Sequence, residues 1–355
     1  MRFLHFALLL TASTVLGAQS RNLDIYTIDA EGGGATLIVS PSGESMLIDT
    51  GYPVGDRDAK RIYAATQQAG LRKIDYVVIS HYHPDHAGGL PALSKMIPLG
   101  QLFGRSTAEL EPANQQWLDN FNNATAAKRT VVKAGDEIPL KGVRVTVVIA
   151  DAKPIAKPVN GGGAANPLCA DAEHQTPAGP ENQRMVGVLL TFGKFRYLNL
   201  SDLDWEKELE LVCPVNKLGA VTLYHVSRHG GLTGSGAPAF LGAIRPQVVV
   251  VNNGPRKGFG ATDNSVKSVT PGGPRPYEKN SYLRLAGLPG IEGVWQMHLS
   301  LLDRDPAHNT APDMIANFEE TADCKGNGFK TSVQRDGKFT VTNSRNGFSK
   351  TYAAR

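Results

Sequence analysis

The sequence has few cysteines, no long run of basic residues and, after its first residues, no long apolar stretch. Three cysteines in 355 residues are too few for a fold held mainly by disulfides. The 37 Lys and Arg against 33 Asp and Glu give a net charge of +4, so there is no strong nucleic-acid signal. The lack of internal apolar stretches excludes a polytopic membrane protein. An apolar content of 41% still allows a sizeable core and excludes disorder over most of the chain.

The first 18 residues have the three parts of a secretory signal peptide. Arg2 precedes a short apolar run over 3–10, and the small residues Gly17 and Ala18 follow. The apolar run is too short to span a bilayer comfortably. We therefore expect residues 1–18 to be removed on export to the periplasm or the extracellular space, leaving no membrane span. The alternative is an uncleaved N-terminal anchor.

The remaining cysteines are Cys169, Cys213 and Cys324. In an oxidising compartment they allow one disulfide and one free thiol. We expect Cys169 to pair with Cys213, because both flank the region to which the chemistry is assigned below.

Short β-like and helical segments alternate along the chain, which predicts an α/β fold. Strands are expected where residues are β-branched or alternate between apolar and polar, at 23–28, 35–39, 45–48, 74–80, 142–150, 186–192, 195–200, 220–226 and 247–251. Helices are expected at 56–68, 112–127, 203–212 and 237–243.

Two segments, 153–184 and 252–276, are irregular and rich in turn-forming residues, as functional loops often are. Near the C-terminus, Asp336-Gly337 and Asn346-Gly347 lie between β-like runs and predict hairpins. The expected organisation is a main domain over 22–310 and a small antiparallel β extension over 311–355. The extension is expected to pack as a lid or to cover a sheet edge.

The segment 81–86, His-Tyr-His-Pro-Asp-His, follows a strand that reads as buried. Three of the nine histidines of the chain fall within these six residues, so the pattern is specific. Imidazoles at alternate positions leave a strand end on the same side, so His81 and His83 can hold one metal ion. Asp85 and His86 lie on the following turn and can hold a second.

Three more residues at strand ends fit such a site. Asp49 and Asp202 each end an apolar strand, and His229 follows another. Alone, a carboxylate there is often a cap or a turn former. Beside the histidine cluster, Asp202 is expected to bridge two ions and His229 to complete the second. Asp49 is expected to orient a ligand or the attacking water, and Asp85 and Asp49 are the candidate catalytic residues.

Together, the motif at 81–86, Asp49-Thr50-Gly51, Asp202 and His229-Gly230 resemble the metallo-β-lactamase superfamily. The segment 29–35, Asp-Ala-Glu-Gly-Gly-Gly-Ala, and the element Arg228-His229-Gly230 are most similar to the branch that contains the metallohydrolase domain of bacterial competence DNA-uptake proteins. The resemblance covers roughly residues 22–305. It implies a four-layer αββα sandwich with the site at one sheet edge. It also implies two metal ions, usually zinc, and hydrolysis by a metal-bound hydroxide.

By this resemblance, the first ion is held by His81 and His83, and the second by Asp85, His86 and His229. Asp202 bridges the two. The superfamily's third histidine on the first ion falls on Asn182 here, and relatives in the same branch tend to have Asn there too. His174 is the alternative ligand, although Asn182 is favoured. At Arg228 the branch usually has His, so this substitution is expected to alter or remove activity if that His matters.

The leading interpretation is an exported metal-dependent hydrolase that acts on a phosphoester, such as a phosphodiester, or on another ester of a small molecule. The alternatives are a lactonase or β-lactamase, and a secreted binding protein with a degraded metal site. Oxygen ligands are also compatible with manganese or iron. Arg228, Arg256 and Lys257 could border the site and hold an anionic group, or Arg256 and Lys257 could be solvated surface charges. His298 is expected to be structural, and His225 to point into a sheet.

Overall fold

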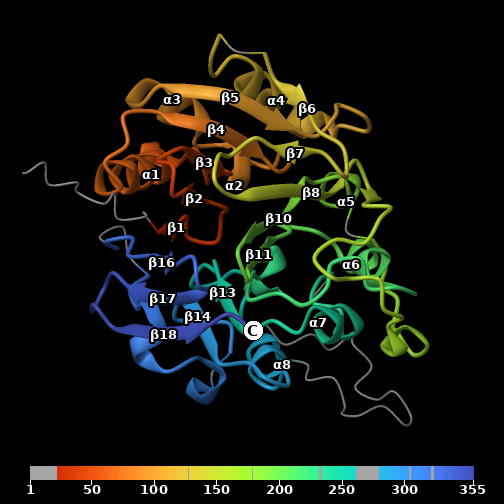
Figure 1. Ribbon diagram of the computed structural model, residues 1–355. Coiled ribbons are helices and arrows are strands. Elements are labelled where there is room, and N and C mark those ends of the chain that lie inside the picture. Colours follow the sequence, from red (N-terminus) through yellow and green to blue (C-terminus); the bar gives the residue numbers. More distant parts are fainter. Residues whose placement is uncertain are drawn as a thin grey trace, which may run out of the picture.

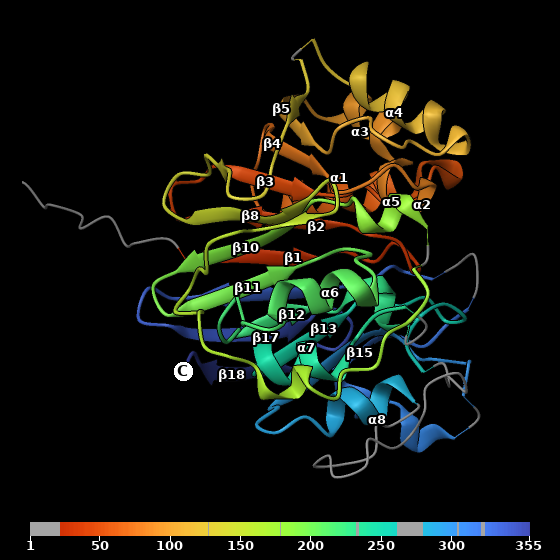
Figure 2. The same cartoon turned by 90° about the vertical axis from the view of Figure 1, so that its right-hand side faces the viewer.

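Two β-sheets stack face to face, and helices cover the outer face of each (Figure 1, Figure 2). The computed structural model describes residues 22–355 except 127, 178, 232–233, 261–279, 304 and 321–323. The predicted signal segment 1–18 therefore lies outside the described residues, as does part of the irregular segment 252–276. Within the described residues, no helix is both long and apolar enough to cross a membrane.

The first sheet has nine strands. In spatial order they are β18 (Ser349–Ala353), β17 (Lys338–Asn343), β16 (Phe329–Val333), β1 (Leu23–Thr27), β2 (Thr36–Val39), β3 (Ser45–Ile48), β4 (Ile74–Ile79), β5 (Leu99–Gly104) and β6 (Thr130–Val131). The strands from β3 to β6 run parallel, and those from β18 to β3 alternate in direction.

The second sheet also has nine strands. In order they are β15 (Ile315–Asn317), β14 (Gly293–His298), β13 (Val248–Val251), β12 (Leu223–His225), β11 (Phe195–Asn199), β10 (Gly187–Phe192), β8 (Arg144–Ala150) and β7 (Glu137–Ile138), with β9 (Lys153–Pro154) also paired to β8. The strands from β11 to β15 are parallel, so their carboxyl ends meet at one edge.

The helices are short and connect the strands. They are α1 (Arg57–Gln68), α2 (Pro84–Ala87), α3 (Leu90–Met96), α4 (Gln115–Asn122), α5 (Pro180–Gln183), α6 (Trp205–Val212), α7 (Pro238–Ile244) and α8 (Ser281–Ala286). The helices α1, α3 and α4 lie outside the first sheet, and α6, α7 and α8 lie outside the second (Figure 2).

Three apolar clusters account for the layers. Successive side chains of a strand point to opposite faces, so Met46 and Ile48 face the space between the sheets, whereas Leu47 faces the helices. In β13, alternate valines likewise contribute to the central cluster and to the cluster beneath α6–α8. An unbroken apolar strand such as this one is buried on both faces. The structure thus confirms the predicted αββα sandwich.

The C-terminal strands do not form a separate unit. β16 pairs with β1, so β16–β18 extend the first sheet, and β15 adds the last strand to the second. The antiparallel hairpins predicted around Asp336-Gly337 and Asn346-Gly347 are present, but they share the central core with the main domain through residues such as Phe339 and Val341. The extension covers the edge that β1 would otherwise expose.

Most predicted elements appear with small changes in their bounds. The helix expected at 112–127 is a 3₁₀ turn over Pro112–Asn114 followed by α4, which ends at Asn122. The loop expected at 153–184 contains β9, a 3₁₀ turn over Pro167–Cys169 and α5. The predicted disulfide between Cys169 and Cys213 is confirmed, and Cys324 is free.

Candidate metal centre

The candidate site lies where strands of both sheets end. Asp49 follows β3 and His81 comes two residues after β4, both parallel strands of the first sheet. In the second sheet, Asp202 follows β11 and His229 follows β12. Because the carboxyl ends of parallel strands gather at one edge, residues far apart in the sequence come together there.

Four buried side chains form one group of convergent ligand atoms: Asp85, His86, Asp202 and His229. The Nε2 atom of His229 lies 3.3 Å from Oδ2 of Asp85 and 3.2 Å from Oδ1 of Asp202. His86 Nε2 lies 3.5 Å and 3.4 Å from the same two oxygens. One ligand atom from each residue lies within 4.8 Å of the others, which is the separation expected around a single ion.

The buried nitrogen atoms of the group that make no hydrogen bond indicate whether it fits a metal ion. The Nε2 atoms of His86 and His229 are buried and have no hydrogen-bond partner among the described residues. Leaving such nitrogens without a partner costs free energy, whereas a cation among the four ligands would satisfy both. The donor set of two imidazoles and two carboxylates therefore fits the second ion of the predicted pair.

His81 and His83 face each other beside this group. His81 Nε2 lies 3.0 Å from His83 Nδ1, and the rings of His81 and His86 have centroids 4.1 Å apart. Burial is the main reason that the pKa of His81 lies well below its ordinary value, with the nearby histidines adding to the effect. A neutral imidazole has the free lone pair that a metal requires.

Asn182 lies on α5, and its buried Oδ1 has no hydrogen-bond partner among the described residues. The neighbouring Glu181 accepts a hydrogen bond from the backbone nitrogen of Tyr82, which connects α5 to the histidine motif. His174, the alternative ligand, lies elsewhere: its side chain is 74% exposed and its Nδ1 is 2.8 Å from Glu206. The structure brings Asn182, but not His174, towards the motif.

The two carboxylates of the group are ionised. Burial alone would raise the pKa of Asp85 and of Asp202, but the imidazoles around them outweigh it and hold both pKa values well below the ordinary range. For Asp85, the ammonium of Lys257 acts in the same direction. The site therefore presents negative oxygen ligands at neutral pH.

Asp49 supports the ligands from behind. Its Oδ2 lies 2.8 Å from Nδ1 of His86 and accepts a hydrogen bond from Ser80 Oγ at 2.7 Å, and its Oδ1 accepts from the backbone nitrogen of Ser80. Ser201 Oγ also lies 3.2 Å from Oδ2. With both oxygens engaged, Asp49 holds His86 with its Nε2 towards the other ligands, which is a positioning role.

A glycine loop approaches the site closely. A side-chain carbon on Gly34 would lie 2.7 Å from Nδ1 of His86 and 3.0 Å from Oδ2 of Asp49. On Gly33 it would lie 2.6 Å from the carbonyl oxygen of Asp85. The glycines of segment 29–35 therefore have a steric reason: no larger residue fits against these ligands.

Lys257 reaches the ligand group from the loop after β13. Its Nζ donates hydrogen bonds to Oδ2 of Asp85, to the carbonyl oxygen of Gly32 and to the hydroxyl of Tyr52. It is therefore not a free surface charge. Arg256, in contrast, lies at the surface, where its side chain is 64% exposed and pairs with Glu320.

Arg228 and His229 both have positive φ, at 50° and 56°, which is uncommon for residues other than glycine. This backbone turns the chain after β12 and presents His229 to the ligand group. The Nη1 atom of Arg228 is buried and has no hydrogen-bond partner among the described residues.

His225 and His298 lie outside the group. His225 is buried in the sheet, with Nδ1 3.2 Å from the hydroxyl of Tyr197, and burial lowers its pKa to about 4. His298 is also buried, with Nε2 2.8 Å from Asp29. Asp29 also pairs with Arg61, so the second cluster of Asp29, His298 and Cys324 is joined to a structural ion pair.

Sequence reasoning missed three residues that hold the ligands in place: Ser80, Ser201 and Asn252. Ser80 and Ser201 contact Asp49, and the Asn252 amide lies 3.1 Å from Nδ1 of His229. Ser80 and Ser201 each directly precede a predicted ligand, which was the available signal. Asn252 directly follows β13, and nothing in the sequence connects it with His229.

Comparison with known proteins finds similarity over part of the chain. Residues 29–144 match the model of the metallo-beta-lactamase superfamily. The chain is 30% identical over 133 residues to the coenzyme F420H(2) oxidase of Methanothermobacter marburgensis, a match that covers 37% of this chain and 31% of the oxidase. It is 30% identical over 104 residues to competence protein ComA of Neisseria gonorrhoeae, covering 28% of this chain and 15% of that protein.

These matches span about a third or less of the length of either relative. Among solved structures, the metallo-beta-lactamase fold protein YhfI from Bacillus subtilis aligns with a TM-score of 0.43 and 12% identity. That alignment covers 66% of this chain and 87% of YhfI.

Proposed function

We propose that this chain, whose residues 29–144 match the model of the metallo-beta-lactamase superfamily, is a metal-dependent hydrolase of that superfamily that acts on a phosphoester or another ester. The observation that carries the proposal is the convergence of Asp85, His86, Asp202 and His229, with two buried imidazole nitrogens that make no hydrogen bond among the described residues. A structural group of this size would pair its polar atoms internally.

In the proposed centre, His81 and His83 hold a first ion together with Asn182, and Asp85, His86 and His229 hold a second. Asp202 would bridge them. Zinc suits the imidazoles, and the oxygen ligands also suit manganese or iron. When bound, such ions lower the pKa of a water towards about 7 and polarise the substrate oxygen.

The remaining groups of the site position ligands and substrate. Asp49 fixes the orientation of His86, and Lys257 donates a hydrogen bond to Oδ2 of Asp85. Arg228 precedes His229 in the sequence, and its buried Nη1 has no hydrogen-bond partner among the described residues, so we propose that it donates to an anionic oxygen of the substrate. A guanidinium matches phosphate and carboxylate geometry, which favours an anionic substrate, such as a phosphoester, over a neutral lactone.

The first test is the metal content of the protein purified without chelator. About two ions per chain are expected, with loss of one or both in Asp202→Asn. One ion in the unaltered protein would mean that Asn182 leaves the first position open. No metal, even after zinc or manganese is added back, would contradict the hydrolase and leave a binding protein on this scaffold.

The substrate class is tested with three chromogenic compounds: a phosphodiester, a carboxylic ester and a β-lactam. We expect metal-dependent turnover of the phosphodiester or the ester, and its loss in His229→Ala. The matched control is His174→Ala, an exposed histidine outside the site. Turnover of the lactam alone would favour the lactonase or β-lactamase interpretation instead.

We also propose that the protein is exported. The residue pattern of segment 1–18 supports this, and so does the Cys169–Cys213 disulfide, since disulfides persist mainly in oxidising compartments. The test is the N-terminal sequence of the protein recovered from its native cells. A start near residue 19 is expected, and retention of Met1 in a soluble cytosolic fraction would contradict export.

A further inference from the structure

Three hollows join along the end of the second sheet that is remote from the metal centre. They are lined by the β10–β11 turn at Gly193 and Lys194, by Thr222 before β12 and by Gln247 before β13. These positions are at the amino ends of β11, β12 and β13, whereas Asp202 and His229 follow the carboxyl ends of β11 and β12. The hollows are therefore separate from the candidate site.

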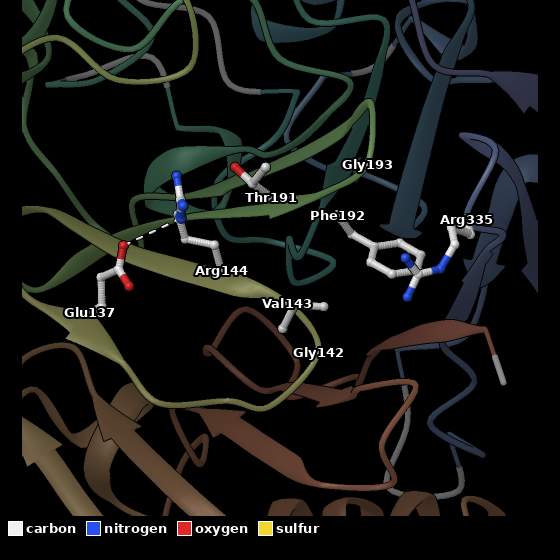
Figure 3. Close-up of a pocket in the computed structure, with 8 residues that line it drawn as sticks. All are labelled: Glu137, Gly142, Val143, Arg144, Thr191, Phe192, Gly193 and Arg335. Carbon is white, nitrogen blue, oxygen red and sulfur yellow. Dashed lines mark ion pairs between the residues drawn. The ribbon is translucent and has the colours of Figure 1, made fainter. Parts of the chain in front are cut away.

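The first hollow, of about 370 Å³, has Arg144 and Arg335 in its wall (Figure 3). Arg335 lies over the ring of Phe192, 5.9 Å from its centroid. Glu137 is the one carboxylate in this wall, 3.4 Å from Nε of Arg144. Both side chains of that pair are more than 60% exposed, so the pair is weak and solvent-screened.

The second and third hollows continue from the first. The second, of about 660 Å³, shares Glu137 and Arg144 with the first and adds Lys157 and Arg196. The third, of about 690 Å³, shares Arg196 with the second. It adds three cations, which are Lys194, Arg245 and Arg355.

The positive charge here is not balanced by the protein. Seven of the 37 basic residues of the chain line these hollows, but only one of the 33 acidic residues does. Two of the seven are ion-paired, Arg144 with Glu137 and Arg355 with Glu292. Among the described residues, the other five have no ion pair within 4.0 Å: Lys157, Lys194, Arg196, Arg245 and Arg335.

Arg196 is fixed where the second and third hollows meet. Its Nε donates to the side-chain oxygen of Asn160 and its Nη1 donates to the carbonyl oxygen of Gly193. No hydrogen bond within the described residues uses its Nη2. A guanidinium held in this way is pre-organised for an anion, because little side-chain entropy remains to be lost on binding.

We propose that the joined hollows bind an extended phosphate chain, a polyanion whose phosphates repeat along a flexible backbone. Five of the seven cations are Arg, whose planar fork matches phosphate oxygens. Three joined hollows suit a chain better than a single compact anion. Among the described residues, the one aromatic residue in their walls is Phe192, which is buried and covered by Arg335 and so offers no face for base stacking. We therefore expect the phosphate backbone to be recognised and the bases not.

Two sources carry this chemistry, a single-stranded nucleic acid and an inorganic polyphosphate. The test is fluorescence anisotropy of a dye-labelled oligothymidylate on the full protein with its metals, over a series of salt concentrations. Unlabelled polyphosphate is the competitor. Binding is expected to weaken steeply with salt, because each neutralised phosphate contributes about 0.7 to the slope of log K against log salt for a single strand.

The informative variant is Lys194→Gln/Arg245→Gln, which removes two exposed or half-exposed charges from the third hollow. The expected slope falls by about 1.4. The control is Lys60→Gln/Arg72→Gln, which removes two exposed charges from the layer of α1 and should leave the slope unchanged. Thermal unfolding checks that both variants fold.

The proposal is supported if the protein binds the oligothymidylate, the polyphosphate or both, and if the slope of log K against log salt falls only in the third-hollow variant. Which of the two chains binds identifies the source of the phosphate chain. Three results would overturn it: no binding of either chain at low salt, equal loss in the control variant, or binding only to anionic phosphatidylglycerol vesicles. Because the oligothymidylate is itself a phosphodiester, the titrations are repeated with His229→Ala, which removes the proposed hydrolysis. Binding that persists in His229→Ala and still responds to the third-hollow substitutions belongs to the hollows, so the proposal stands or fails separately from the function proposed above.

Discussion

The Oδ2 atom of Asp49 lies 2.8 Å from Nδ1 of His86, in a buried contact between the end of β3 and the helix α2. This contact leaves Nε2 of His86 directed at the carboxylates of Asp85 and Asp202. An imidazole that donates from one nitrogen to a carboxylate keeps a lone pair on the other, so Asp49 prepares His86 for a metal without touching the ion.

Asp49→Asn should weaken metal binding by about 10- to 100-fold, the usual effect of losing a carboxylate behind a ligating histidine. The measurement is a competition titration with a metal-sensitive dye. Asp75→Asn, in β4 but hydrogen-bonded to Ser45 away from the site, is the control and should leave affinity unchanged. Unaltered affinity in Asp49→Asn would show that Asp49 does not set the orientation of His86.

Gly34→Ala should also weaken metal binding, for a steric reason. The added carbon would lie 2.7 Å from Nδ1 of His86, closer than real contacts allow, so the ring or the loop must shift. Gly55→Ala has open space around the new carbon but a positive φ. It should lower stability by about 1–2 kcal/mol with no effect on metal content, which separates backbone strain from the clash. Measuring the metal content and the thermal unfolding of both variants distinguishes the steric clash from the backbone strain.

Lys257→Met should strengthen binding of the second ion. Burial alone would lower the pKa of Lys257, but the carboxylates of Asp85 and Asp202 outweigh it and raise the pKa, so the group is a cation at neutral pH. Its ammonium competes with an ion for Oδ2 of Asp85. A hydrogen bond to a charged group contributes about 1.5–3 kcal/mol, so an increase in affinity of roughly 10- to 150-fold is expected.

The control for Lys257 is its neighbour Arg256, which pairs with Glu320 at the surface. Arg256→Met removes the same charge from the same loop and should leave the titration unchanged. Weaker metal binding in Lys257→Met would instead show that the ammonium positions Asp85 for the ion.

Glu208 on α6 should make stability depend on pH. Burial raises its pKa to about 8 from an ordinary 4.5, so the folded protein keeps a proton that the unfolded chain releases between these values. Its contribution to stability is fully present below pH 4.5 and is lost as the pH rises towards 8. Glu208→Gln should flatten the decline between about pH 5 and 8, measured by chemical unfolding. Glu210→Gln, exposed on the same helix, should leave the curve as it is.

Much of the fold followed from local patterns. The β-branched run over 74–80 and the apolar segment 45–48 became β4 and β3 almost residue for residue, because a strand buried on both faces requires such runs. The position of the C-terminal strands could not be predicted from local patterns. The pairing of β16 with β1 joins residues about 300 positions apart, and no local pattern encodes such a partner.

The candidate site also has one part that the sequence predicts and another that depends on the tertiary structure. Residues 81–86 show their metal-binding chemistry by type and spacing alone, since alternate imidazoles at a strand end share one side. The contact of Lys257 with Asp85 spans 172 positions and depends on how the loop after β13 folds back over Gly32. From the sequence, Lys257 could either hold an anionic group at the site or be a solvated surface charge.

The sequence by itself determined the alternation of strands and helices, the histidine motif and the residues able to ligate a metal, because these depend on residue type and short-range spacing. Only the tertiary structure decided which of them meet. Asp85, Asp202 and His229 converge because parallel strands of two sheets end at one edge, and Asn182 rather than His174 approaches the motif because Glu181 bonds the backbone of Tyr82. Long-range packing fixes such contacts, and it is set by the burial of the whole chain.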